Sequence, residues 1–370
     1  MKIKNHISTA AILLVTVILC GCKSLSLTRQ SEFSRFKGIE DFSKFKCSTN
    51  QNGETVLLSP KIRSHICWNE LIASWNADAL DGTFVKVEAS AILPGHATKF
   101  YTLAEWSPDG KIFPRTSVRG QKDADGNVDT DTLILNQAAN AAQFRVTLGG
   151  TNGAMPALKF LGISFSNTKI PVARREPNHA AWGKIIATPE HSQHGPWTDK
   201  GWCSPTSLSM ALSRWAGILQ RPEMDLAVPQ VAAKVYDSDR SGTGNWPFNT
   251  AFAGSFAGMR SYVTRLDDLS EVEDWIAAGI PVIISARWDW LRPGRPTDAD
   301  GHLIVCIGFT EDGDLVINDP AARPERGIFV RQIYKRADVI HAWTKSHNTV
   351  YLVYPVGAKI PADKYRHWEK

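Results

Sequence analysis

The sequence lacks a long apolar run after its first twenty residues, a dense run of Lys or Arg, an internal repeat and a low-complexity tract. A membrane-spanning helix needs about 20 mostly apolar residues, so no transmembrane segment is expected in the body of the chain. A formal charge of +5 over 370 residues, without a basic cluster, argues against a nucleic-acid partner. With 43% hydrophobic and 21% charged residues, the composition is that of a globular protein.

Residues 1–21 are predicted to be a lipoprotein signal peptide. Two lysines precede the apolar residues 12–19, a run that is too short for a membrane span and has the length of a signal-peptide core. The run ends in LCGC, which resembles a bacterial lipobox, and this implies cleavage before Cys22 and lipid on it. Acyl chains on Cys22 would provide the membrane attachment, and Lys23 favours an outer-membrane or surface anchor. The alternative is ordinary secretion without lipid.

Cysteine is scarce, and the few cysteines that remain have different contexts. Cys47 and Cys67 lie in one region of an exported chain, where they form either a disulfide or two free thiols. Cys306 lies in the apolar run HLIVCIGF, which predicts a buried strand with cysteine as a small hydrophobic residue. Cys203 lies neither in that N-terminal region nor in an apolar strand, so neither interpretation applies to it.

The first half of the chain predicts a β-rich domain. Residues 22–36 are polar and predict a tether, and residues 37–168 predict an antiparallel β-sandwich because short strand-like segments alternate with turn residues. No convincing long amphipathic helix lies between these segments. The strands are expected at 83–93, 100–106, 131–136, 143–149 and 158–165.

Two features of this domain leave alternatives open. The stretch KDADGNVDTD, residues 122–131, has acidic or amide oxygens at alternate positions, which is typical either of a Ca²⁺ loop or of a solvated hairpin turn. It lacks the closing Glu of an EF-hand, and we expect the hairpin turn. Trp68, Trp75 and Trp106 would form either a platform that contacts a glycan or part of the core, and we expect the core.

The second half predicts an α+β domain over residues 191–370, after a linker at 169–190. PTSLSMALSRWAG repeats apolar residues at helical spacing, and LSEVEDWIAAG, with Ser270 as a cap and Glu273 three residues later, predicts a second helix. An antiparallel sheet is expected from strands at 280–288, 301–309, 314–320 and 349–355.

Cys203 lies at the predicted start of a helix. A catalytic thiol needs a lowered pKa, a base and donors for an oxyanion, and the N-terminus of a helix favours the thiolate. His302 begins a predicted strand and is the candidate base. If residues 311–314 form a hairpin turn in ideal register, Asp319 lies opposite His302 and orients it. Asn318 is the alternative orienting residue.

Together these motifs resemble the C39-like cysteine peptidase family, which has a papain-like fold. WCSPTSLSMAL, IAAGIPVIISARW and GHLIVCIGFTEDGDLVINDPAA carry the resemblance over about residues 180–357. It implies Cys203 as the nucleophile, His302 as general base and acid, and Asp319 as its orienting partner. The family also has a Gln before the Cys as an oxyanion donor; Gln193 matches it, with His194 as the alternative. Many members have Cys-Gly where this chain has Cys-Ser, a departure that removes no catalytic group.

The resemblance implies a cysteine hydrolase that cleaves amide bonds in a peptide or protein, with no metal or cofactor, and the lipobox-like LCGC places it, as an exported and lipid-anchored protein, in the cell envelope. Relatives that process bacteriocins are fused to transporters, and this chain has no such segment, so their substrate is not carried over. One alternative is an amidase or transpeptidase-like enzyme acting on cell-wall peptide. Another is a glycan- or surface-binding lipoprotein with an inactive peptidase-like domain. The Gly-rich residues 238–252 are either a wall of the cleft or a surface loop.

Overall fold

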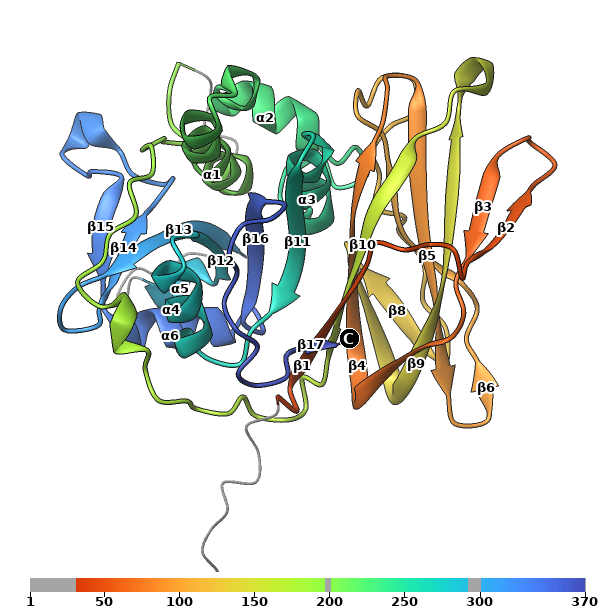
Figure 1. Ribbon diagram of the computed structural model, residues 1–370, viewed down its shortest axis with the longest axis horizontal. Coiled ribbons are helices and arrows are strands. Elements are labelled where there is room, and N and C mark those ends of the chain that lie inside the picture. Colours follow the sequence, from red (N-terminus) through yellow and green to blue (C-terminus); the bar gives the residue numbers. More distant parts are fainter. Residues whose placement is uncertain (1–30, 197–200, 292–300, 370) are drawn as a thin grey trace, which may run out of the picture.

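The computed structural model describes residues 31–196, 201–291 and 301–369 (Figure 1). An N-terminal β-rich domain and a C-terminal domain of helices and strands lie side by side, and they appear in red to yellow and in green to blue in Figure 1. The predicted signal peptide and Cys22 lie outside the described residues. Within the described ranges, no helix combines the length and the apolar character that crossing a bilayer requires.

The N-terminal domain is a sandwich whose two layers are joined by long, bent strands. The first part of β9 pairs with β4 and β8, while its second part pairs with β3 and β5, so β9 passes from one layer to the other. The strands are β1 Ser34–Ile39, β2 Lys46–Thr49, β3 Thr55–Leu58, β4 Ile62–Asp78, β5 Thr83–Leu93, β6 His96–Ala97, β7 Tyr101–Trp106, β8 Gly126–Asp129, β9 Thr132–Gly150 and β10 Ala157–Ser166.

The core of the sandwich uses the three tryptophans considered above. Trp68, Trp75 and Trp106 are all almost completely buried, so they cannot form a glycan platform. Trp75 packs edge-on against Trp106 and against Phe248, a residue of the other domain. The tryptophans therefore stabilise the core, as expected, and extend it toward the domain interface.

The C-terminal domain has an antiparallel sheet of strand order β11-β16-β12-β13-β14-β15, with α1 and α4 packed against it. This arrangement confirms the predicted α+β fold. The elements are α1 Cys203–Leu219, α2 Val228–Val235, α3 Trp246–Ser255, β11 Met259–Arg265, α4 Leu269–Ala277, β12 Val282–Ala286, α5 Trp288–Leu291, β13 His302–Phe309, β14 Leu315–Asn318, β15 Arg331–Tyr334, α6 Arg336–Thr344 and β16 Thr349–Pro355.

The sequence pattern does not predict α3, because this helix has no polar face. It packs against β4 of the sandwich on one side and β11 on the other, so eight of its ten residues are buried. Periodicity detects a helix only when one face is polar. The helix begins after Asn245, whose side chain accepts a hydrogen bond from the Phe248 N–H at 3.0 Å.

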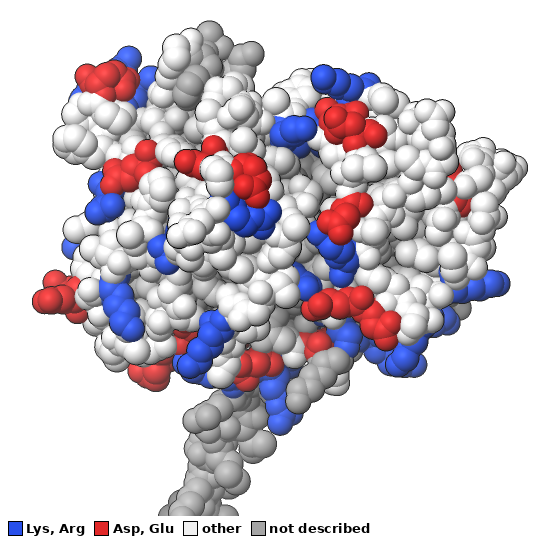
Figure 2. Space-filling model, turned by 45° about the horizontal axis from the view of Figure 1, so that its top comes forward, with Lys and Arg blue, Asp and Glu red and all other residues white. Residues whose placement is uncertain are grey.

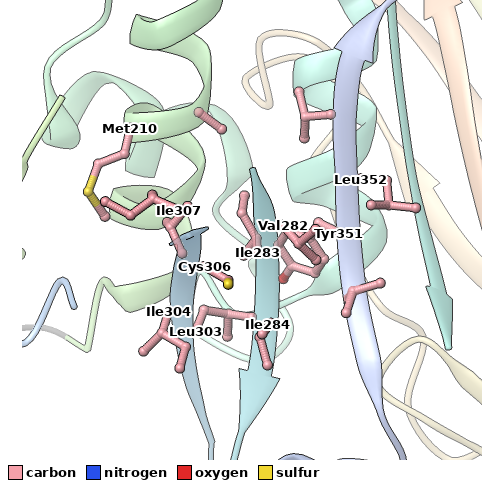
Figure 3. Close-up of a cluster of buried hydrophobic side chains, with 14 of the residues drawn as sticks. Met210, Val282, Ile283, Ile284, Leu303, Ile304, Cys306, Ile307, Tyr351 and Leu352 are labelled. Atoms are coloured by element: carbon pink, nitrogen blue, oxygen red, sulfur yellow. The ribbon is translucent and has the colours of Figure 1, made fainter. Parts of the chain in front are cut away.

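An apolar layer holds α1 against the sheet (Figure 3). Met210 of α1 approaches Ile307 of β13, and the labelled side chains of β12, β13 and β16 alternate between this face of the sheet and the opposite one. Each fully buried side chain of this size contributes roughly 2 kcal/mol relative to an exposed one. Two hydrogen bonds orient α1 relative to the sheet: Ser207 Oγ donates to the Leu303 carbonyl at 3.0 Å, and Ser204 Oγ lies 2.9 Å from the Tyr351 hydroxyl.

The tether predicted at residues 22–36 is too long, since its last part belongs to the fold. Phe33 and Phe36 are buried, and the Phe36 ring stacks on Tyr262 of the C-terminal domain with centroids 4.3 Å apart. The last strand, β17 Trp368–Glu369, returns to pair in parallel with β1. Aromatic packing between the domains thus draws both ends of the described chain to one sheet edge, and the predicted boundaries at 36 and 191–370 do not separate the domains.

The linker predicted at residues 169–190 is also too long. Ala181 and Ile186 are buried in the C-terminal core, and the Ile186 N–H donates to the Ile307 carbonyl at 2.6 Å. Gly308 makes this approach possible, because a Cβ there would lie 2.1 Å from the Lys184 carbonyl oxygen. Residues from 181 onward therefore belong to the C-terminal domain.

The cap predicted for α4 is wrong. Asp268 caps this helix by accepting from the Ser270 N–H at 2.8 Å, so Ser270 lies inside the helix. Glu273 is fully buried instead of closing a capping box, and it accepts from Trp182 Nε1 at 2.8 Å and Arg336 Nη1 at 2.6 Å.

The disulfide alternative is wrong as well. Cys47 and Cys67 are exposed free thiols on β2 and β4, two strands that do not pair. Cys306 is buried in β13, as predicted, and burial raises the pKa of its thiol to about 12.

The acidic stretch 122–131 forms a hairpin. Its carboxylates turn to separate partners: Asp123 pairs with Lys99, and Asp125 with His96. No group of three or more metal-binding side chains gathers in the described part of the chain. The calcium alternative therefore has no support from the geometry.

Replacing Glu273 with Ala should leave the buried Trp182 N–H without an acceptor and Arg336 without its carboxylate. We expect a loss of about 3 kcal/mol in the free energy of unfolding, measured by urea denaturation. Glu325→Ala, which removes an exposed carboxylate with only distant ion pairs, is the matched control and should change stability by less than about 0.5 kcal/mol. Equal effects of the two substitutions would contradict this role of Glu273.

Candidate active site

Cys203 is the first residue of α1, and its thiol is partly exposed. Burial raises the pKa of this thiol, but a hydrogen bond and charge from His302 and the backbone N–H groups of Leu303 and Ser204 lower it. The net pKa lies below that of an ordinary cysteine. The structure therefore favours a thiolate at Cys203, which is the form that acts as a nucleophile.

His302 and Asp319 form a hydrogen-bonded pair beside this thiol. His302 Nε2 lies 2.7 Å from Asp319 Oδ1, and both side chains are buried. Because Nε2 faces the carboxylate, the other ring nitrogen, Nδ1, remains for the hydrogen bond with Cys203. Cys203, His302 and Asp319 are thus brought together as the sequence analysis expected.

The predicted register between β13 and β14 is wrong by two residues. Beside the turn, Phe309 pairs with Leu315, three residues from the predicted register, because the turn is longer than expected. A bulge between Cys306 and Gly308 brings the register back by one residue, so that Val305 pairs with Asn318. His302 is therefore diagonal to Asp319 and not directly opposite it. A shift of two residues keeps both side chains on the same face of the sheet, so the pair still forms. Asn318, the alternative orienting residue, donates instead toward the carbonyls of residues 188 and 189.

Charges and hydrogen bonds strengthen the pair. Burial lowers the pKa of His302, but Asp319 and the Cys203 sulfur raise it to about 9. Burial raises the pKa of Asp319, while His302, the Tyr334 hydroxyl and the Ala321 N–H bring it down to about 2. Between these two values the imidazolium and the carboxylate are both charged. Their stabilising effect is lost as pH falls through about 2 and as it rises through about 9.

Two residues around the pair were not found from the sequence. Tyr334, the last residue of β15, donates to Asp319 Oδ2. The Trp288 ring lies edge-on to the His302 ring, with centroids 4.3 Å apart. Trp288 covers the imidazole and reduces its contact with water. An aromatic residue at the end of a predicted strand was the only available signal for it, and that signal is weak.

Gln193 lies close to this pair through its backbone. The Gln193 N–H donates to the Pro320 carbonyl at 2.8 Å, and Ser192 Oγ donates to the Ala322 carbonyl at 2.8 Å. On the other side, His191 Nδ1 lies 2.8 Å from Ser209 Oγ of α1. Gln193 is buried between the turn after Asp319 and the helix that begins with Cys203. This position is compatible with the predicted oxyanion role, which stays a prediction.

Cys203 lines a cavity of about 470 Å³ at the domain interface. Gly244 and Trp246 line it, so the stretch 238–252 contributes a wall, as one of its two interpretations held. The sandwich contributes a second wall through Glu70 and the β8–β9 turn, including Asp131. The acidic turn was predicted from the sequence, but its place in the cleft was not.

Buried polar contacts fix the second wall. Asp131 Oδ2 accepts from the Trp246 N–H at 2.9 Å, and burial raises the pKa of Asp131 to about 6. Glu70 Oε2 binds Arg265 Nη2 at 2.7 Å across the interface, with both side chains buried. The two domains therefore form one cleft.

The charge distribution around the molecule is mixed. Lys and Arg side chains are interspersed with Asp and Glu on the face drawn in Figure 2. This face has no extended patch of one sign, and it presents no surface of the kind that binds a polyanion.

Iodoacetamide should modify Cys203 of the folded protein much faster than Cys306 between pH 6 and 8, because one thiol pKa is lowered and the other raised. Site-resolved mass spectrometry measures both rates.

His302→Ala should slow modification of Cys203 by about tenfold or more. The difference in rate between wild type and His302→Ala should shrink above pH 9, where the wild-type imidazolium loses its proton. Asp319→Asn should shift that alkaline loss to lower pH. An unchanged rate in His302→Ala would remove His302 from this role.

Two family models match the chain. The model of the Peptidase C39 N-terminal domain matches residues 34–166, and the model of the Peptidase C39-like family matches residues 157–351, more than half of the chain. No curated protein matches it.

Solved structures show weaker likeness. A Bacillus anthracis protein named as a C39-like peptidase is 16% identical, with a TM-score of 0.36 over 48% of this chain and 98% of its own. The C-terminal CBM6 of LamC, a laminarinase from Zobellia galactanivorans, is 14% identical, with a TM-score of 0.19 over 35% of this chain and 98% of its own. TM-scores this low carry no argument, and the assignment rests on the family models: the chain belongs to the C39-like peptidase family.

Proposed function

We propose that the protein is a cysteine peptidase that cleaves amide bonds through Cys203, His302 and Asp319. The observation that carries the proposal is the hydrogen-bonded chain from the Cys203 sulfur through His302 to Asp319, at the wall of a cavity. A lowered thiol pKa and a raised imidazole pKa describe a thiolate–imidazolium pair, which is ready for attack on a carbonyl carbon.

The residues then act in a defined order. The Cys203 thiolate attacks the carbonyl carbon, and the negative oxygen is stabilised by the Cys203 backbone N–H and the Gln193 amide. The His302 imidazolium gives its proton to the departing amine, which leaves an acyl group on Cys203. Neutral His302 next removes a proton from water as the water oxygen bonds to the acyl carbon; the C–S bond then breaks, which releases the acid and restores the Cys203 thiolate beside the protonated His302. Asp319 keeps the ring oriented throughout.

Support for a polypeptide substrate comes from the cleft and from the family. The cavity lies between two domains, and its walls carry exposed groups of both signs, including Asp129 and Lys345. Such a cleft has room for a chain that makes polar contacts on both sides. The family models are those of peptidases.

Cys203→Ala should abolish hydrolysis of fluorescently labelled casein, with kcat/KM falling by at least about 10³-fold. His302→Ala should have a similar effect, because the thiolate and the proton donor are both lost. Cys67→Ser, which changes an exposed free thiol outside the lining of the cavity, is the control and should retain full activity. Hydrolysis that survives in Cys203→Ala would exclude Cys203 as the nucleophile.

We also propose that the enzyme is exported and held in the cell envelope by lipid on Cys22. The lipobox-like LCGC supports this, and β1, the first strand after the predicted attachment, lies at a surface edge of the sandwich paired with β17. Cys22→Ser should move the protein from the detergent phase to the aqueous phase in Triton X-114 partition, since lipid supplies the affinity. Unchanged partition would contradict the anchor, while Cys67→Ser should behave as wild type.

A further inference from the structure

We propose that the N-terminal domain binds a neutral oligosaccharide in a groove on the outer face of its second layer, independently of the peptidase site. The groove has a volume of about 620 Å³, within the range of ~300–1,000 Å³ that is usual for ligand sites. Its lining belongs entirely to the sandwich and shares no residue with the cavity at Cys203.

The register of four neighbouring strands creates this face. Lys86 of β5 pairs with Thr147 of β9 and with Glu105 of β7, and Val56 of β3 pairs with the same Thr147. Alternate side chains of a strand point to opposite faces. Val85, Val87 and Val146 face the buried core, so Lys86, Glu88, Arg145 and Thr147 line the outer face.

Two aromatic rings form one end of the groove. Phe84 and Phe113 have centroids 4.8 Å apart and are both half-buried, so part of each ring is accessible. Gly149 makes room for Phe84, because a Cβ there would lie 2.5 Å from the ring. Aromatic rings with an accessible face pack against the C–H face of a sugar, which is apolar on that side only.

The polar groups of the groove are held in fixed orientations by one another. Arg145 binds Glu88 through two hydrogen bonds of 2.7 and 2.8 Å, and Lys86 lies 3.2 Å from Glu105. Planar carboxylate and guanidinium groups that are already oriented can exchange further hydrogen bonds with sugar hydroxyls without reordering.

The charge balance selects the ligand. Lys86 and Arg145 are opposed by Glu54, Glu88 and Glu105, so the groove has no excess of positive charge. An anionic ligand would have to displace a carboxylate from its ion pair. A neutral, hydroxyl-rich ligand avoids this cost, and its apolar ring faces match the two phenylalanines.

The position of the groove allows both sites to be used together. The groove uses the second half of β9, around Thr147, whereas the catalytic cavity uses its first residues, around Thr132. A glycan held in the groove would leave the cleft open. The sandwich would then hold the peptidase domain at a surface that displays such glycans.

Isothermal titration calorimetry on full-length protein carrying Cys203→Ser tests the proposal with four trisaccharides: cellotriose, laminaritriose, xylotriose and triacetylchitotriose. We expect saturable binding of at least one. Phe113→Ala should weaken that binding by at least tenfold, and Phe84→Ala and Lys86→Ala should also weaken it. Phe329→Ala, which removes an exposed phenylalanine of the other domain, is the matched control and should bind as the parent does.

Three results would overturn the proposal: no binding of any of the four sugars, binding that Phe113→Ala and Lys86→Ala leave unchanged, or tighter binding of the anionic trigalacturonate. Circular dichroism on each variant separates loss of the groove from loss of the fold, and Phe113→Ala and Lys86→Ala alter partly exposed side chains. When Phe113→Ala or Lys86→Ala is introduced into the protein that retains Cys203, the rate of casein hydrolysis should be unchanged. Failure of the peptidase proposal would leave the binding result intact.

Discussion

The packing of α1 against β13 is the constraint on which the site depends. Cys203 begins the helix and His302 begins the strand, so the distance between thiol and imidazole is set where these elements meet. Buried side chains hold the two together, and the hydrogen bond from Ser207 to the Leu303 carbonyl sets the helix against the strand along its length. A displacement of α1 by one turn would separate the two groups.

The electrostatics of the site follow from that packing. His302 and Asp319 are buried and Cys203 is partly buried, and burial alone would keep the thiol, the imidazole and the carboxyl group neutral. Their proximity reverses this tendency for all three. Tyr334 and Trp288 complete the arrangement, one by donating to Asp319 and the other by covering His302.

Much of this could be predicted from the sequence, and what could not has physical reasons. The apolar face of α1 and the order of Cys203, His302 and Asp319 are local patterns, and they led to the correct fold and to the residues that meet. The register failed because neither the length of the turn between β13 and β14 nor the bulge near Gly308 leaves a local signature, and α3 was missed because burial on two sides removes its polar face. Trp288 and the wall formed by Asp131 depend on contacts between distant segments, which periodicity does not report.

The cleft has walls from two domains, and this affects how the protein can change. The β8–β9 turn belongs to a sandwich that folds around its own core, yet Asp131 reaches α3 and lines the cavity at Cys203. Substitutions in that hairpin alter the shape of the pocket without touching Cys203, His302 or Asp319. The C-terminal domain alone would keep the reacting groups but lose one side of the pocket. Diversification of a surface hairpin is therefore a route by which related chains can acquire different substrates while their chemistry stays constant.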